Sequence, residues 1–187
     1  MGIRRRAREL AMQALFFMDM RPDSVDQDRL ALFCQSCPPP KKSLPLFMEL
    51  VEGVRRYGGQ IDHIIERFSS NWKISRMGGV DRNVMRVAVY EMLCCPDIPP
   101  KVSINEAIDI GKKYGTEESG AFINGILDAI HLAITRKDPA VSLQAPPEPE
   151  PPPAESSPAQ VPPPVEPAET ISRVKVRQGL VRRRSTT

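Results

Sequence analysis

The sequence predicts an all-α protein, a compact bundle of about six or seven helices followed by a disordered, proline-rich tail. In residues 1–137, apolar side chains recur at steps of three and four, the period of one helix face. No segment there alternates polar and apolar residues with turns at hairpin spacing. Residues 138–187 hold 12 of the 20 prolines and no aromatic side chain, too little apolar surface to offset the chain entropy of folding. We therefore expect a helical domain at 1–137 and a disordered tail at 138–187.

The N-terminal half of the domain should contain several helices. Residues 3–18 carry an apolar face at helical spacing, and the Met20–Asp23 segment, with its proline, stops that helix. A shorter helix is expected around 25–34. Ser43 can then cap a helix that Gly58-Gly59 ends, and the isoleucines of 61–68 line a further helix.

The C-terminal half continues the pattern. A short amphipathic piece at 72–77 should end at Gly78-Gly79, before a helix over 80–93. The run Ser103-Ile-Asn-Glu106 has the form of a capping box, which predicts a helix from there to Tyr114. Thr116 or Ser119 should open the last helix, which extends to residue 134.

The motifs of the common enzyme classes are absent from the sequence. It has two histidines, and it contains no HExxH zinc motif, Walker loop, dinucleotide-binding glycine pattern or nucleophile elbow. We therefore expect no catalysis and no cofactor. Its apolar runs are too short to cross a membrane and no signal peptide is evident, which favours a cytoplasmic location.

The four cysteines leave two interpretations open. Cys34 and Cys37 have the spacing of zinc ligands, but the adjacent Cys94 and Cys95 are a poor second pair for a metal site. Zinc or redox function is therefore one interpretation, and the other is four reduced, partly buried thiols.

The most informative local feature is a basic run at the amino terminus, Arg4-Arg5-Arg6-Ala-Arg8. On a helix these guanidinium groups should spread over the surface beside the apolar face, and guanidinium pairs well with RNA phosphates. Four positive charges at a helix N-terminus oppose the helix dipole, so helix stability alone does not explain them. The run therefore suggests RNA binding, and the alternative is a solvated helix start.

Three blocks of sequence are more specific. They are RRRARELAMQALF at 4–16, VDRNVMRVAVYEML at 80–93, and KVSINEAI, KKYG and FINGIL between 101 and 127. In this order and spacing they resemble the NusB family of bacterial transcription antitermination factors, over about residues 3–135 and weakly between 20 and 60. The resemblance implies a helical fold of two packed subdomains.

The resemblance also implies a function. It predicts binding of the boxA element of leader RNA together with NusE, a small-subunit ribosomal protein. The pair is expected to join an elongating RNA polymerase complex and to suppress termination, chiefly on ribosomal RNA operons. The resemblance also allows a homodimer that hides the arginines. Two rivals remain: the RNA-binding module found fused to ribosomal RNA methyltransferases, and an adaptor that binds only proteins. The residues after 137 are too few for a methyltransferase domain.

The resemblance assigns roles to individual residues. Those matching the family's RNA-binding positions are Arg4, Arg5, Arg6, Arg8, Lys113, Glu118, Phe122 and Asn124. Those matching the surface for the protein partner are Phe16 and Asp81, with Arg86 as a neighbour. Each has a structural alternative: Phe122 can be core, Asn124-Gly125 a close packing point between helices, and Asp81 a first-turn acid that favours the helix dipole.

The sequence departs from the family pattern in three places. Phe16 stands where the family has tyrosine, so a hydroxyl contact is lost. Gly78-Gly79 should shorten or loosen the start of the helix that carries Asp81. The tail has no family counterpart, and its last 17 residues carry six bases and no acid. We expect either that this basic end raises RNA affinity without sequence preference or that it is passive.

Overall fold

Helix α1 (Ile3–Asp19) forms because its apolar residues repeat along one face, and that face is buried against the rest of the protein. Leu10 and Ala11 at its centre are wholly inaccessible to solvent. The computed structural model describes residues 2–21, 26–70 and 72–144. The N-terminal helix is thus confirmed, and its apolar face forms part of the hydrophobic core.

Two further helices follow, α2 (Asp26–Ser36) and α3 (Leu44–Phe68). The expectation that Gly58-Gly59 ends a helix is wrong, because α3 runs through both glycines without interruption. Neither glycine has a positive φ. The buried side chains of Val54 and Ile61, one on each side of the pair, anchor both halves of the helix in the core. This packing outweighs the local cost of two glycines, about 1 kcal/mol each.

A short 3-10 turn, η1 (Ile74–Arg76), precedes α4 (Gly79–Cys94), and α5 (Pro100–Tyr114) and α6 (Ser119–Thr135) complete the series. The capping box at Ser103 is wrong, because α5 already begins at Pro100. Proline suits the first position of a helix, since that position needs no N–H donor. Ser103 is therefore inside the helix and buried, and it makes no cap hydrogen bond.

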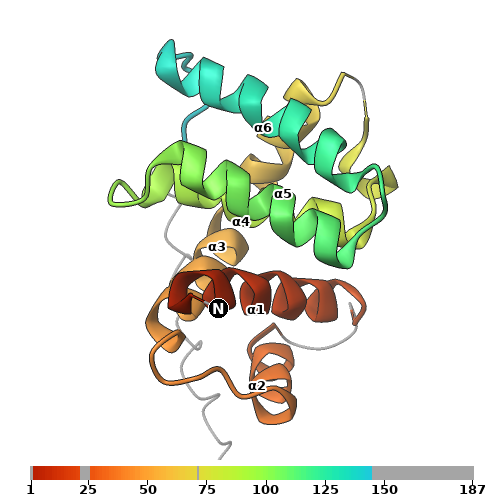
Figure 1. Cartoon of the computed structure of the whole chain (residues 1–187), viewed down its shortest axis with the longest axis vertical. Helices are drawn as coiled ribbons and strands as arrows, with labels where there is room; N and C mark the ends of the chain where they lie inside the picture. The colour runs from red at the N-terminus through yellow and green to blue at the C-terminus, as the bar shows by residue number, and fades with distance from the viewer. Residues whose placement is uncertain (1, 22–25, 71, 145–187) are drawn as a thin grey trace, which may run out of the picture. The chain divides into compact units, whose positions relative to one another are not determined.

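The helices pack as two groups, α1–α3 and α4–α6, which meet across α4 (Figure 1). Helix α4 contacts α1 and α3 on one side and α5 and α6 on the other. Across the described ranges the protein is helical throughout, with six α-helices and no strand. The all-α fold is confirmed.

The chain continues to pack on the helices beyond Lys137. Val141 is buried, and Gln144 exchanges two hydrogen bonds with Gln60 of α3, at 2.8 and 2.9 Å. The packed part of the chain therefore reaches at least Gln144. The remainder of the expected tail, 145–187, lies outside the described residues. None of the described helices is both long enough and apolar enough to cross a membrane.

Candidate nucleic-acid interface

A buried carboxylate, Glu9, joins the start of α1 to the end of α5. It is wholly inaccessible to solvent and accepts hydrogen bonds from the Lys113 ammonium at 2.9 Å and the Tyr114 hydroxyl at 3.3 Å. The guanidinium groups of Arg5 and Arg6 lie 3.9 and 3.7 Å from the same carboxylate. Hydrogen bonds to Tyr114 and Glu9 raise the pKa of Lys113 above its ordinary value. One acid therefore gathers three cations from two distant segments.

Arg5 is held by a second acid. Its Nη1 donates to the Asp109 carboxylate of α5 at 2.9 Å, and this hydrogen bond raises the pKa of Arg5. Arg4 is exposed one position earlier. Both arginines line a groove of about 850 Å³ beside the start of α1. The side chains of Arg5 and Arg6 remain 31% and 38% exposed, so their guanidinium groups are ordered by acids yet accessible to an anion.

Arg8 corrects the expectation that all four guanidinium groups spread over the surface. It is 4% exposed, and its Nε–H is shared between the two oxygens of Glu91 on α4, at 2.8 and 3.0 Å. Glu106, expected to be a helix cap, lies with its carboxylate 3.7 Å from Nη1 of Arg8. Arg8 therefore links α1, α4 and α5 from within, and its RNA contact stays a prediction.

The other predicted RNA-binding residues lie at the start of α6. Glu118 precedes the helix, and Phe122 and Asn124 are half-buried in its first turns. The Phe122 ring meets the ring of Trp72 nearly edge-on, with 6.1 Å between centroids. The Phe122 ring is thus partly buried against Trp72 and partly exposed to solvent. The alternative that Asn124-Gly125 is a close packing point is wrong, because a Cβ at Gly125 would meet open space.

Phe16, one of the predicted protein-partner residues, packs against the start of the helix that carries Asp81. The Phe16 ring is 37% exposed and lies directly against Gly79, where a Cβ would come within 3.0 Å of two ring carbons. Gly79 does not loosen the helix as expected, because it is the first residue of α4 and Gly78 accepts the 2.9 Å hydrogen bond from Arg82 N. Its missing side chain makes room for the aromatic ring of Phe16.

Two predicted RNA-binding residues and one predicted partner-binding residue line the same hollow. Asp81, in the first turn of α4, lines a cavity of about 250 Å³ together with Trp72, Glu118 and Phe122. One oxygen of Asp81 is buried there and has no hydrogen-bond partner among the described residues. The predicted RNA surface at α6 and the predicted protein surface at α4 are therefore neighbours.

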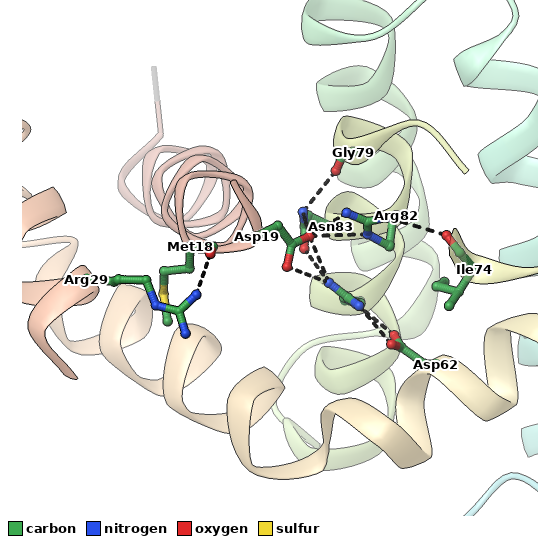
Figure 2. Close-up of polar contacts among 9 residues, drawn as sticks. Met18, Asp19, Arg29, Asp62, Ile74, Gly79, Arg82 and Asn83 are labelled. Carbon is green, nitrogen blue, oxygen red and sulfur yellow. Dashed lines mark hydrogen bonds and ion pairs between the residues drawn. The ribbon is translucent and has the colours of Figure 1, made fainter. Parts of the chain in front are cut away.

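Arg86 takes part in an ion-pair network rather than standing on the surface. Its guanidinium makes two 2.7 Å hydrogen bonds to Asp62 of α3 and a further one of 3.1 Å to Asp19 at the end of α1. Asp19 also accepts from Arg82 at 2.7 Å and from Asn83 at 2.9 Å (Figure 2). The network fastens α1, α3 and α4 together.

The four cysteines are free thiols. Burial, with the nearby charge of Glu49, raises the pKa of Cys95 to about 12, and burial also raises the pKa of Cys34 and Cys94. Within the described part of the chain, no three His, Cys, Asp or Glu side chains are grouped as metal ligands. Thiols with raised pKa values are poor nucleophiles near neutral pH.

Sequence reasoning missed the acids and the tryptophan of this surface. Glu9 carried a local signal, since it stands three and four residues after Arg6 and Arg5 on one helix, but Lys113 is 104 residues away. Asp109 and Trp72 carried no comparable signal in the sequence. An exposed single tryptophan is recognisable only once its surroundings are known.

Comparison with known proteins gives a consistent result. The model of the NusB family matches residues 5–131. The chain is 56% identical over 140 residues to a transcription antitermination protein NusB of Desulfatibacillum aliphaticivorans, covering 75% of this chain and 97% of the relative. Among solved structures it resembles NusB of T. maritima, with a TM-score of 0.60, 40% identity, and coverage of 67% of this chain and 87% of that one.

The chain is also similar to one protein of a solved complex. The chain matches a protein in a crystal structure of the antitermination factors NusB and NusE with double-stranded RNA. The TM-score is 0.63 at 30% identity, and the match covers 70% of this chain and 97% of the other. Both the sequence and the fold are therefore similar over nearly the whole length of these proteins.

Proposed function

The chain belongs to the NusB family, and from this premise we propose that it is a transcription antitermination factor that binds boxA-type leader RNA together with the ribosomal protein NusE. In this role it joins the RNA polymerase elongation complex, chiefly on ribosomal RNA operons. It acts by binding alone, without catalysis or cofactor. Its four free thiols suit a reducing compartment such as the cytoplasm.

The observation that carries the RNA proposal is the arrangement of cations around Glu9. A buried acid fixes Arg5, Arg6 and Lys113 in one place while leaving their outer atoms accessible. Pre-ordered guanidinium groups lose little entropy when they pair with phosphates, so such a surface favours a polyanion. Arg4 extends it along the groove at the start of α1.

The remaining contacts follow from the same surface. Phe122 offers a ring on which an unpaired base can stack, and Glu118 and Asn124 beside it can accept or donate hydrogen bonds to base edges. Exposed Phe16, which packs against Gly79, and Asp81, two residues further along α4, supply the surface for NusE. Arg86 supports this surface from beneath, because its charge is already paired with Asp62 and Asp19.

A gel-shift experiment tests the proposal. Labelled boxA RNA should bind the full chain weakly alone and more tightly with purified NusE, and a scrambled RNA should bind less tightly. The double variant Arg5→Ala/Arg6→Ala should lose RNA binding while keeping its circular dichroism spectrum and its affinity for NusE. If the protein binds NusE but no RNA, it is instead an adaptor that binds only proteins. If it transfers methyl groups from a labelled donor, it is instead related in function to the ribosomal RNA methyltransferases.

The oligomeric state can be tested with the same protein and RNA. A homodimer that covers the groove beside Arg4 and Arg5 would compete with RNA. We therefore expect sedimentation to show less dimer when boxA RNA is added. A dimer that persists with RNA bound would use another surface.

A further inference from the structure

Trp72, the only tryptophan of the chain, stands exposed between α3 and α4. It is 54% accessible to solvent, and its indole touches the edge of Phe122 with an angle of 63° between the rings. Exposing so large an apolar side chain forgoes the stability that its burial would supply. An aromatic pair left open to solvent at a predicted RNA surface therefore invites a functional explanation.

The backbone of Trp72 is held firmly. Its N–H donates to the Ser69 carbonyl at 3.2 Å, and the Ser69 hydroxyl donates to the Trp72 carbonyl at 2.8 Å. The turn is fixed again two residues later, where the Ile74 N–H donates to the Glu66 carboxylate at 2.8 Å. The backbone N–H and carbonyl of Trp72 are thus both held by Ser69, so a ligand does not have to order the backbone at this residue.

The indole lines two hollows. The first is the 250 Å³ cavity at Phe122, whose charged side chains are Glu118, Asp81 and Arg76. The second is a cavity of about 480 Å³, lined by Arg67, Lys73 and Glu66 together with His63. Lys73 lies 3.6 Å from Glu66, and its side chain is still 71% exposed. Acceptors for base amines are therefore available in the first hollow, and partners for phosphate in the second.

We propose that Trp72 is a stacking subsite for one further nucleotide of the RNA, adjoining the one at Phe122. The base stacks on the indole with its edge toward Glu118, and its phosphate lies toward Arg67 and Lys73. This inference rests on the proposed function, since it extends the same RNA path. A single-stranded nucleic acid fits better than a protein segment, because a pair of aromatic rings beside two cations matches its bases and phosphates.

The tryptophan itself reports on the contact. Because the chain has one tryptophan, fluorescence excited at a wavelength that its three tyrosines do not absorb comes from Trp72 alone. Adding single-stranded boxA RNA to the full chain, with and without NusE, should quench this fluorescence along the same curve as binding measured from a labelled RNA. Binding without any change in fluorescence would overturn the proposal.

Variants measure the contribution of the indole. Trp72→Ala should weaken binding of boxA RNA about tenfold, the loss expected for one base stacked on an aromatic ring. Trp72→Tyr should restore most of it, and Trp72→Leu, which keeps apolar bulk without a π-face, should not. Leu132→Ala is the matched control, since Leu132 is also 53% exposed but lies outside both hollows. Equal affinities for Trp72→Ala and Leu132→Ala would overturn the proposal.

Shortened RNAs separate this proposal from the function on which it rests. Removing nucleotides one at a time from each end of the probe should reach a length at which the natural chain and Trp72→Ala bind equally. If Arg5→Ala/Arg6→Ala abolishes binding but Trp72→Ala matches the natural chain at every length, the subsite fails and the RNA function stands. If the natural chain binds no RNA, both fail. If Trp72→Ala weakens only NusE binding, Trp72 belongs to the protein surface and the proposal is overturned.

Discussion

Glu9 accepts a hydrogen bond from the Lys113 ammonium at 2.9 Å, with its carboxylate wholly buried and its partner half-exposed. The acid lies beneath the surface and the cations lie on it, and three cations share that one anion. A cluster of like charges would otherwise repel itself and remain poorly ordered. Glu9 thus allows a dense positive surface to exist on a stable helix.

Replacing Glu9 with Gln should therefore affect both stability and RNA recognition. We expect the free energy of unfolding to fall by about 1–3 kcal/mol, because a buried acceptor for charged donors is weakened. Affinity for scrambled RNA should rise, since one negative charge is removed, while the preference for boxA RNA falls. Urea unfolding and RNA titrations measure these effects.

Glu117→Gln is the control for the change in charge. Glu117 is exposed, so its replacement removes the same charge without loosening the arginines. Stability should stay within about 0.5 kcal/mol, as for most surface substitutions, and the preference for boxA RNA should be retained. If both variants lose the preference equally, net charge matters and the ordering by Glu9 does not.

The buried pair of Arg8 and Glu91 should matter for stability instead. Glu91→Gln leaves the Arg8 guanidinium charged in the interior, so we expect a loss of about 3–5 kcal/mol in the free energy of unfolding. The double variant Arg8→Met/Glu91→Leu removes both charges and should be close to the natural protein in stability. Urea unfolding compares the three proteins.

The double variant also tests the predicted RNA contact of Arg8. Once folded, it should bind boxA RNA as the natural protein does, because Arg8 is buried. A large loss of RNA affinity without a loss of fold would show that Arg8 reaches the RNA after a rearrangement. Arg5→Ala, a change on the exposed part of the same helix, supplies the comparison.

The sequence was informative where structure depends on local pattern. The apolar face of α1, the final helix from Ser119 and the breaks at proline follow from spacing and backbone chemistry. The expectation that the Arg8 guanidinium lies on the surface was wrong for a physical reason: its partner Glu91 lies 83 residues away, and helical spacing cannot identify such a partner. The resemblance predicted which helices contact RNA, but it did not predict the buried acid that orders the cations of α1 and α5.

The glycines show the same limit. Local propensity ends a helix at Gly58-Gly59 and weakens one at Gly79, yet α3 runs through the first two glycines and α4 begins at the third. At Gly58-Gly59 the buried residues on both sides decide the outcome. At Gly79 the absent side chain makes room for the ring of Phe16, from another helix. Tertiary contacts thus outweigh local propensity at these three glycines.

These glycines give a paired prediction. Gly59→Ala should raise the free energy of unfolding by about 0.5–1 kcal/mol, because Gly59 is exposed in mid-helix and a Cβ there meets nothing within 4 Å. Gly79→Ala places its methyl group on the Phe16 ring and should displace it, so NusE affinity falls while RNA binding by the chain alone is unchanged. Thermal unfolding and calorimetric titration measure the two effects. An unaltered NusE affinity would mean that Phe16 is not part of that surface.

The Asp19 network predicts a pH dependence. Burial alone would raise the pKa of the Asp19 carboxyl, but hydrogen bonds from Asn83 and Arg82 and the charge of Arg86 outweigh it and hold the pKa below its ordinary value. A carboxyl with a depressed pKa in the folded state stabilises the protein above its unfolded pKa, near 4, and this contribution is lost as pH falls through the folded pKa. The network should therefore weaken only in acid.

The variant Asp19→Asn tests the predicted direction of this change in stability with pH. At pH 7 the variant should lose about 1–3 kcal/mol in the free energy of unfolding, because the donors of Arg82 and Arg86 lose a charged acceptor. Between pH 5 and 3 the difference from the natural protein should shrink, since the natural carboxyl becomes protonated and loses the same interactions. Asp128→Asn, on an exposed position of α6, is the control and should show no such convergence. A difference that stays constant across this range would mean that Asp19 stabilises the fold through its shape and not through its charge.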